Sequence, residues 1–302
     1  MMYMNPRMVG CGERTLVLSH GYGGSHAIWD RVLPHLALTN MVLLFDWDFS
    51  CADEAAAAAE ERYTFARYAD ELAAVMDEMG VSGAVYVGHS MAGMIGCIAS
   101  VKRPDLFTHL VLVGASPRYI NSDDYEGGFD EPDIHAMLAT ISSDFLSWAN
   151  GFVPLIAGGD PSTVETLAGS FFAMDPRVAH ALARMVFLGD NRDVLDRVAV
   201  PCTLVHASGD FAAPPCVGAY MADCLGKRRR AAAAAMVTVD SVGHFPQLVA
   251  PDEMLRVLDL VLANAADDEE PADQAAAGKE GSSSGLAIAA EVDVKGDIDV
   301  AS

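Results

Sequence analysis

A serine between an apolar strand and an apolar helix is the residue of this sequence best placed to do chemistry. Ser90 lies in the pentapeptide GHSMA (88–92), after the apolar run Val85–Gly88 and before the helical stretch Met91–Lys102. The small residues at positions 88 and 92 let a strand and a helix approach closely around a sharp turn, which lifts the serine hydroxyl above the edge of a sheet. We therefore predict that Ser90 is a nucleophile.

A serine hydroxyl is not ionised at neutral pH, so a nucleophilic serine needs a neighbouring base. His244 follows the apolar strand Ala235–Val239, in a loop at the carboxyl end of that strand, where functional groups of parallel α/β sheets gather. We interpret three other histidines as structural: His89, which the turn should direct elsewhere, His206, inside a strand, and His20, packed under a glycine-rich loop. His244 is the predicted base.

The base needs a carboxylate that fixes its tautomer. Asp210 follows the strand Thr203–Ala207, again at a carboxyl end. Asp193 and Asp196 are alternatives, but they fall near the end of a helical stretch and are more typical of helix ends or surface positions. The chain order Ser90, Asp210, His244 is that of serine hydrolases with the α/β-hydrolase fold, so Asp210 is the predicted acid.

Stabilising the charge on an attacked carbonyl oxygen takes two backbone N–H donors. Met91, directly after the serine, should supply one of them. The second should come from the loop HGYGG (20–24), with the Tyr22 N–H favoured, because the glycines let the backbone close on a substrate. A phosphate-binding loop is the alternative for this stretch, but neither the dinucleotide nor the Walker glycine spacing is present.

Apolar strands and amphipathic helices alternate along much of the chain, which predicts a mostly parallel sheet with helices on both faces. The expected strands are Thr15–Ser19, Met41–Phe45, Val85–Gly88, His109–Gly114, Thr203–Ala207 and Ala235–Val239. The expected helices between them include Thr64–Met79, Met91–Lys102 and Pro215–Leu225.

The alternation stops over residues 117–193, where we expect four helices (131–141, 143–150, 162–172 and 176–188) and no clear strand. This helical insertion divides the sheet domain into residues 1–116 and 194–264. The insertion is rich in aromatic residues. They could simply fill its own core, or some of them could face the sheet and line a pocket.

The protein has 302 residues and a formal net charge of −23, of which residues 264–302 supply −8. A surface this acidic repels phosphate backbones, so nucleic-acid binding is disfavoured. Residues 265–302 lack aromatic side chains and are rich in Ala, Gly, Ser and acid, which predicts a disordered acidic tail. We interpret the basic run 227–230 as a solvated loop and residues 52–59 as either a helix or a loose loop.

No apolar run is long enough for a membrane helix, and residues 1–10 lack an apolar signal core. The six cysteines are scattered, with no CxxC pair, which is typical of thiols in a reducing compartment. We expect a monomeric protein that contacts no membrane, needs no metal or cofactor and resides in the cytoplasm, with the nucleus as a second location.

Over residues 5–263 the sequence resembles the plant α/β-hydrolase receptors related to Dwarf14 and the karrikin receptor, and the RsbQ-type bacterial hydrolases. Matching motifs are GERTL (12–16), HGYG (20–23), RPDLF (103–107), ASPRY (115–119), DYEGGF (124–129) and VPC (200–202). Within that family, FDWDFS (45–50) and GHSMAG (88–93) are most similar to the Dwarf14-like-2 branch.

The resemblance implies that residues 117–193 form a four-helix, V-shaped lid over an apolar pocket. It places six residues at pocket-lining positions: Tyr22, Tyr119, Phe129, Trp148, Phe152 and Phe187. It also implies butenolide ligands that the triad cleaves slowly, and signalling through an F-box protein.

Two functions are consistent with these residues and with the resemblance. The first is a serine hydrolase of a small apolar ester or butenolide-type lactone with a ligand-sensing role. The second is a slow-turnover receptor for a strigolactone-like or karrikin-like molecule that acts through a protein partner. A degenerate, purely structural hydrolase is disfavoured because Ser90, Asp210 and His244 are all present.

Overall fold

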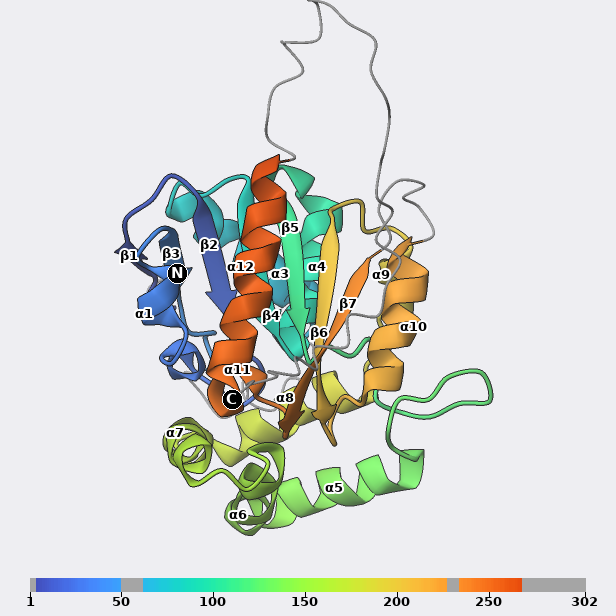
Figure 1. Ribbon diagram of the computed structural model, residues 1–302. Helices are drawn as coiled ribbons and strands as arrows, with labels where there is room; N and C mark the ends of the chain where they lie inside the picture. Colours follow the sequence, from blue (N-terminus) through green and yellow to red (C-terminus); the bar gives the residue numbers. More distant parts are fainter. Residues whose placement is uncertain (1–3, 50–61, 227–233, 268–302) are drawn as a thin grey trace, which may run out of the picture.

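A seven-stranded sheet forms the centre of the computed structural model, which describes residues 4–49, 62–226 and 234–267 (Figure 1). The strand order is β1-β3-β2-β4-β5-β6-β7, with β1 antiparallel to β3 and every other pair parallel. The strands are β1 (Arg7–Gly10), β2 (Thr15–Ser19), β3 (Met41–Leu44), β4 (Ala84–His89), β5 (Phe107–Val113), β6 (Cys202–Gly209) and β7 (Ala235–Val242). The mostly parallel sheet predicted from the alternating pattern is confirmed.

Helices cover both faces of this sheet. In Figure 1, α12 (Pro251–Asp267) crosses the face turned toward the viewer, while α3 (Phe65–Glu78) and α4 (Met91–Lys102) lie behind the strands. Among the described residues, the other helices of the core are α10 (Pro215–Gly226) and the short segments η1 (His26–Trp29), α1 (Leu33–Leu36), η3 (Pro104–Leu106), α9 (Arg192–Leu195) and α11 (Pro246–Val249). Because both faces are covered, a central strand such as β4 is buried along its whole length and reads as a continuous apolar run.

The edge strand β1 is absent from the prediction. It has four residues, none of them buried, and pairs Arg7 with Leu44 and Gly10 with Met41. A strand that is short and solvated at the sheet edge carries no apolar periodicity, so only its pairing with β3 defines it.

The helical insertion holds α5 (Glu131–Ser143), α6 (Phe145–Ile156), α7 (Pro161–Phe171) and α8 (Pro176–Leu188). These four helices lie below the carboxyl ends of the parallel strands in Figure 1. The Asp-Pro steps that punctuate the sequence are helix starts, since Asp160 and Asp175 each cap a helix through the side chain and are followed by proline.

Helix α6 runs six residues past its predicted end at 150. Pro154 lies inside this helix, although proline removes a helical hydrogen bond and crowds the preceding turn. The helix nevertheless continues, with Val153 and Ile156 almost completely buried. Tertiary burial of these side chains outweighs the local preference.

Several expectations fall on residues outside the described ranges. They are the loop 52–59, the basic run 227–230 and residues 268–302 of the expected tail. The tail boundary at 265 is wrong by three residues, because α12 continues through the helix-favouring alanines 265 and 266 to Asp267. Among the described helices, none combines the length and apolarity that a bilayer crossing requires.

Candidate active site

Ser90 occupies a strained turn between β4 and α4. Its backbone has φ +57° and ψ −122°, a conformation that costs a non-glycine residue free energy and that persists where surrounding contacts impose it. The contacts are close, since a Cβ on Gly88 would lie 2.7 Å from the Ala92 carbonyl oxygen. The pattern of small residues around Ser90 therefore has the structural reason that the sequence indicated.

Asp210 and His244 form a buried pair. The Asp210 Oδ2 atom lies 2.7 Å from His244 Nδ1, and both residues are about 5% exposed or less. The second carboxylate oxygen accepts hydrogen bonds from the backbone N–H groups of Ala212 (2.8 Å) and Ala213 (3.1 Å), which fix the carboxylate in place. Because a carboxylate accepts, His244 donates from Nδ1, and a neutral ring then keeps its lone pair on Nε2.

The end of β5 brings this pair to the turn that carries Ser90. The Ser90 N–H donates to the Val113 carbonyl at 2.8 Å. The next residue, Gly114, faces the pair: a Cβ there would lie 3.0 Å from His244 Cε1 and 3.4 Å from Asp210 Oδ2. Two consecutive residues of one strand end thus contact the turn on one side and the histidine–aspartate pair on the other.

The alternative carboxylates have other positions. Asp193 lies in the first turn of α9, and Asp196 is the C-cap of that helix. Both match the helix-end interpretation that the sequence favoured for them.

The main chain of His244 is held from two sides. Its N–H donates to the Ile156 carbonyl at the end of α6 at 2.7 Å, and its carbonyl accepts from His89 Nε2 at 2.8 Å. The His89 ring also packs on Phe245, with ring centroids 4.4 Å apart. Burial lowers the pKa of His89 well below its usual range, so this histidine is neutral and structural, as predicted.

The glycine-rich loop lies directly against the nucleophile. A Cβ on Gly21 would stand 2.8 Å from Ser90 Cβ, so the Gly21–Tyr22 peptide borders the serine side chain. Met91 follows Ser90 as the first residue of α4 and is 1% exposed. Both predicted oxyanion donors, the N–H groups of Tyr22 and Met91, therefore belong to segments that meet at Ser90.

The six aromatic residues predicted for the pocket form one connected cluster. Tyr22 contacts Trp148 and Phe187, with centroids 6.3 and 6.4 Å apart, and Phe187 contacts Tyr119 at 4.9 Å. The remaining pairs are Phe129–Phe187 and Tyr119–Phe129, both at 6.4 Å, and Trp148–Phe152 at 4.5 Å. The cluster joins the loop beside Ser90 to the helical insertion.

Phe171 is a member of this cluster that the sequence reasoning did not select. Its ring lies 5.6 Å from Tyr22 and 6.2 Å from Phe152, and the residue is fully buried at the end of α7. The sequence marks Phe171 only as one of many aromatics in the insertion. Its role depends on how α7 packs on the loop after β2, which no local pattern encodes.

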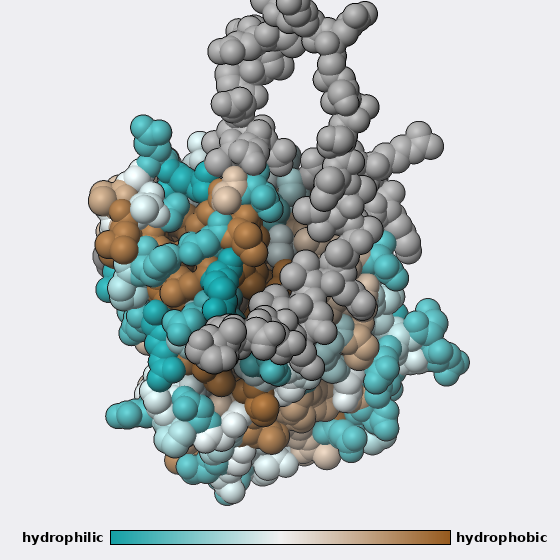
Figure 2. Space-filling model, viewed as in Figure 1, coloured by the Kyte–Doolittle hydropathy of each residue, from teal (hydrophilic) through white to brown (hydrophobic). Residues whose placement is uncertain are grey.

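Apolar surface continues outside the site. Figure 2 shows it where the insertion meets the ends of β6 and β7. Exposed large apolar side chains include Leu155 of α6 (52% exposed), Val242 of β7 (61%) and Phe211 of the loop after β6 (41%). An apolar molecule reaching this junction meets apolar side chains.

Comparison with known proteins defines the class to which this fold and site belong. Residues 14–251 match the family described as alpha/beta hydrolase fold. A hydrolase from Oleispira antarctica superposes with a TM-score of 0.78 at 26% sequence identity, covering 87% of this chain and 95% of that chain. The chain belongs to the α/β-hydrolase fold family.

The sequence relatives narrow this class. The Karrikin insensitive 2 receptor CA of Petunia hybrida is 38% identical over 257 residues, covering 84% of this chain and 93% of the receptor. The Strigolactone esterase D14 of Arabidopsis thaliana is 35% identical over 257 residues, covering 84% and 94%. The chain is a member of the family that these receptors and esterases form, which confirms the resemblance seen in the sequence; the Dwarf14-like-2 branch stays a prediction.

Proposed function

We propose that this protein is a serine hydrolase of a small ester or butenolide-type lactone, with a ligand-sensing role in signalling. One observation carries the proposal: the buried Asp210–His244 pair and the strained Ser90 turn meet at the same end of β5. The esterase among the relatives supports the hydrolase activity, and the receptor supports the ligand-sensing role.

In this mechanism the Ser90 hydroxyl attacks the carbonyl carbon while His244 Nε2 takes its proton. Asp210 holds His244 in the required tautomer and stabilises the imidazolium that forms. The N–H groups of Tyr22 and Met91 bind the developing oxyanion. His244 then protonates the leaving oxygen, which leaves the acyl group on Ser90. In the second half, His244 takes a proton from the attacking water and returns it to Ser90 as the acid is released.

The helical insertion acts as a lid in this proposal, and the aromatic cluster lines the pocket beneath it. Tyr22, Tyr119, Phe129, Trp148, Phe152 and Phe187 present mainly ring surface, which favours a neutral, apolar substrate over a charged one. Burial raises the pKa of both Tyr22 and Tyr119, so their hydroxyls stay protonated and add no charge to the pocket.

The test is turnover of p-nitrophenyl acetate and of a butenolide ether with a fluorescent leaving group. Ser90→Ala should reduce both to background. Ser100→Ala is the matched control, because Ser100 is a buried serine of α4, the helix that follows Ser90, and its hydroxyl donates to the Cys97 carbonyl. Turnover that survives in Ser90→Ala at the wild-type rate would overturn the proposal.

A slow-turnover receptor is the second candidate, and the hydrogen bond between His244 and Ile156 favours it. This bond joins the proposed base to the insertion, so chemistry at His244 can alter α6. The partner in that case would be a signalling protein of the F-box kind. A butenolide should then change the melting temperature and promote partner capture in the wild type more than in Ser90→Ala, whereas equal responses would exclude a role for the chemistry.

A further inference from the structure

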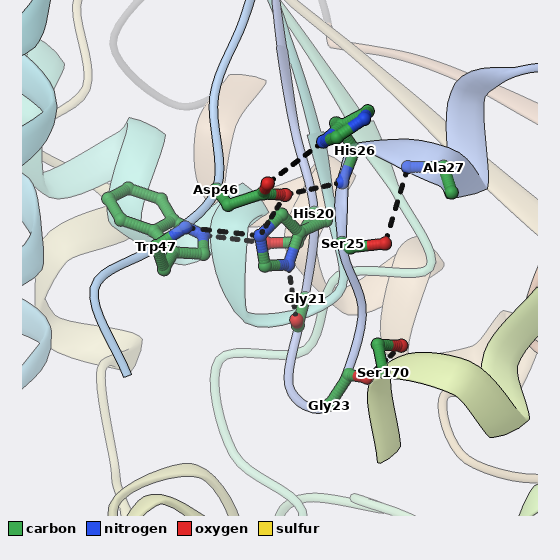
Figure 3. Close-up of polar contacts among 9 residues, drawn as sticks. All are labelled: His20, Gly21, Gly23, Ser25, His26, Ala27, Asp46, Trp47 and Ser170. Carbon is green, nitrogen blue, oxygen red and sulfur yellow. Dashed lines mark hydrogen bonds and ion pairs between the residues drawn. The ribbon is translucent and has the colours of Figure 1, made fainter. Parts of the chain in front are cut away.

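His20 lies beneath the glycine-rich loop and contacts its backbone. Its Nδ1 atom is 2.9 Å from the Gly21 carbonyl oxygen, which also accepts the Gly24 N–H at 3.2 Å. Its Nε2 atom is 3.1 Å from the Trp47 N–H. Figure 3 shows the imidazole between the loop on one side and the Asp46–Trp47 segment on the other.

These partners determine the tautomer of His20. A carbonyl oxygen can only accept, so Nδ1 carries the proton and donates to Gly21. A backbone N–H can only donate, so Nε2 carries the lone pair and accepts from Trp47. His20 is 1% exposed, and burial lowers its pKa to about 4 despite the neighbouring Asp46 carboxylate. The two hydrogen bonds therefore select the neutral Nδ1–H form, even though Asp46 Oδ1 also lies 3.6 Å from Nε2, beyond hydrogen-bond distance.

The geometry of the peptide bond carries this constraint to the nucleophile. The Gly21 carbonyl and the Tyr22 N–H belong to one planar trans peptide, so they point in opposite directions. His20 and Gly24 hold the Gly21 carbonyl on one side of the peptide, and the Tyr22 N–H therefore points to the opposite side. The same peptide borders Ser90, since a Cβ on Gly21 would stand 2.8 Å from Ser90 Cβ.

We propose that His20 is a positioning residue for oxyanion stabilisation: in the Nδ1–H tautomer imposed by the Trp47 N–H, it holds the Gly21 carbonyl and so aims the Tyr22 N–H at the Ser90 site. The inference rests on the proposed hydrolase function. His20 touches no substrate in this role and transfers no proton.

Other contacts of the loop support a fixed backbone. Trp47 Nε1 donates to the His20 carbonyl at 2.8 Å. Asp46 accepts from the His26 N–H at 2.7 Å and lies 2.9 Å from His26 Nδ1, which anchors the far end of the loop. From the insertion, the Ser170 hydroxyl donates to the Gly23 carbonyl at 2.7 Å (Figure 3). These contacts hold the loop at His20, at Gly23 and at His26.

Kinetics of two variants test the role. His20→Leu loses both ring nitrogens, and kcat for p-nitrophenyl acetate should fall about 100-fold, as for loss of one oxyanion donor, with KM nearly unchanged. Affinity for a trifluoromethyl ketone, which forms a tetrahedral oxyanion adduct on serine, should fall in parallel. His20→Asn keeps a side-chain N–H that can reach the Gly21 carbonyl. It should recover at least tenfold of the lost kcat, because this donor again orients the Tyr22 N–H toward the oxyanion.

Leu16→Ala is the control for lost stability, because Leu16 is fully buried in β2, the strand that leads to His20. It should lower the melting temperature and leave kcat and ketone affinity within about threefold, since it removes no hydrogen bond of the loop. The proposal is overturned if folded His20→Leu keeps both within threefold, or if Leu16→Ala loses as much.

A second measurement needs no turnover and no variant. The 15N chemical shifts of His20 in labelled wild-type protein should report the Nδ1–H tautomer, unchanged from pH 8 to pH 5, beside the titratable neighbours Asp46 and His26. An Nε2–H tautomer, or titration near pH 6.5, would overturn the role of His20. Wild type without esterase activity would instead count against the hydrolase, so the two failures are distinguishable.

Discussion

The main-chain N–H of His244 donates a hydrogen bond to the carbonyl of Ile156, at 2.7 Å, across 88 positions of the chain. Ile156 ends α6 in the helical insertion, and His244 belongs to the loop after β7. The proposed base thus has its backbone bonded to the insertion and its ring bonded to Asp210 of the sheet domain. The position of the proposed base therefore depends on the position of α6.

Gly158→Ala should separate α6 from this loop. Gly158 has φ +63°, and a Cβ there would lie 2.6 Å from the Val242 carbonyl carbon and 3.1 Å from the Gly243 nitrogen. The substitution should lower kcat about tenfold or more, because the displaced loop carries His244. Steady-state kinetics and thermal unfolding check this expectation.

Gly159→Ala is the matched control for the backbone cost alone. Gly159 has φ +76°, but apart from its two chain neighbours no described residue has an atom within 4 Å of its Cβ position. It should destabilise the protein by about 1–2 kcal/mol, the cost of a left-handed alanine, and leave kcat near wild type. Equal kcat losses in the two variants would contradict a coupling through the contact.

Asp210→Asn should abolish most of the activity while preserving the fold. The amide can no longer hold His244 as the Nδ1–H tautomer by charge, and in an equivalent triad this change costs about 10⁴-fold in kcat. The measurement is hydrolysis of p-nitrophenyl acetate, with circular dichroism as the check on folding. Asp259→Asn, at a half-exposed ion pair with His35, is the control and should be silent; a modest loss in Asp210→Asn would argue for another acid.

Stability should depend on pH through three buried histidines. Burial lowers the pKa of His20 to about 4 and also lowers the pKa of His89 and His206. Between pH 6.5 and 4 these histidines bind protons in the unfolded chain but stay neutral in the folded chain. The free energy of unfolding therefore falls as the pH falls. His20 alone should account for about 3 kcal/mol of this loss.

Urea unfolding at pH 7, 5.5 and 4.5 checks this dependence. The slope should be smaller in His20→Asn, which has no imidazole to protonate at this position. A wild-type free energy that stays level across this range would refute the expectation.

Trp47→Phe isolates one hydrogen bond of the loop stem. It removes the Nε1 donor of the His20 carbonyl but keeps an aromatic ring beside Phe45 and Tyr68. Loss of a buried hydrogen bond should cost about 1–3 kcal/mol beyond the loss of ring volume. Trp29→Phe measures the volume term, since Trp29 is also fully buried and its Nε1 has no hydrogen-bond partner among the described residues. Equal destabilisation of the two variants would assign no energy to the His20 contact.

Much of the fold could be predicted because its signals are local. The buried strands of the parallel sheet read as short apolar runs, and the four insertion helices as helical stretches, two of which start at Asp-Pro steps. The solvated edge strand β1 and the continuation of α6 past Pro154 could not be predicted. In both places pairing or burial against distant residues outweighs the local preference.

The sequence by itself determined the turn at Ser90, since a strained strand-to-helix turn needs small residues at fixed neighbouring positions, and these are consecutive in the chain. It also determined which strand ends carry Asp210 and His244. Only the tertiary structure decided how the groups around them are held: His20 by Trp47, His244 by Ile156, and Tyr22 by Phe171. Those partners lie 27 to 149 positions apart, and such contacts arise from packing rather than from any local pattern.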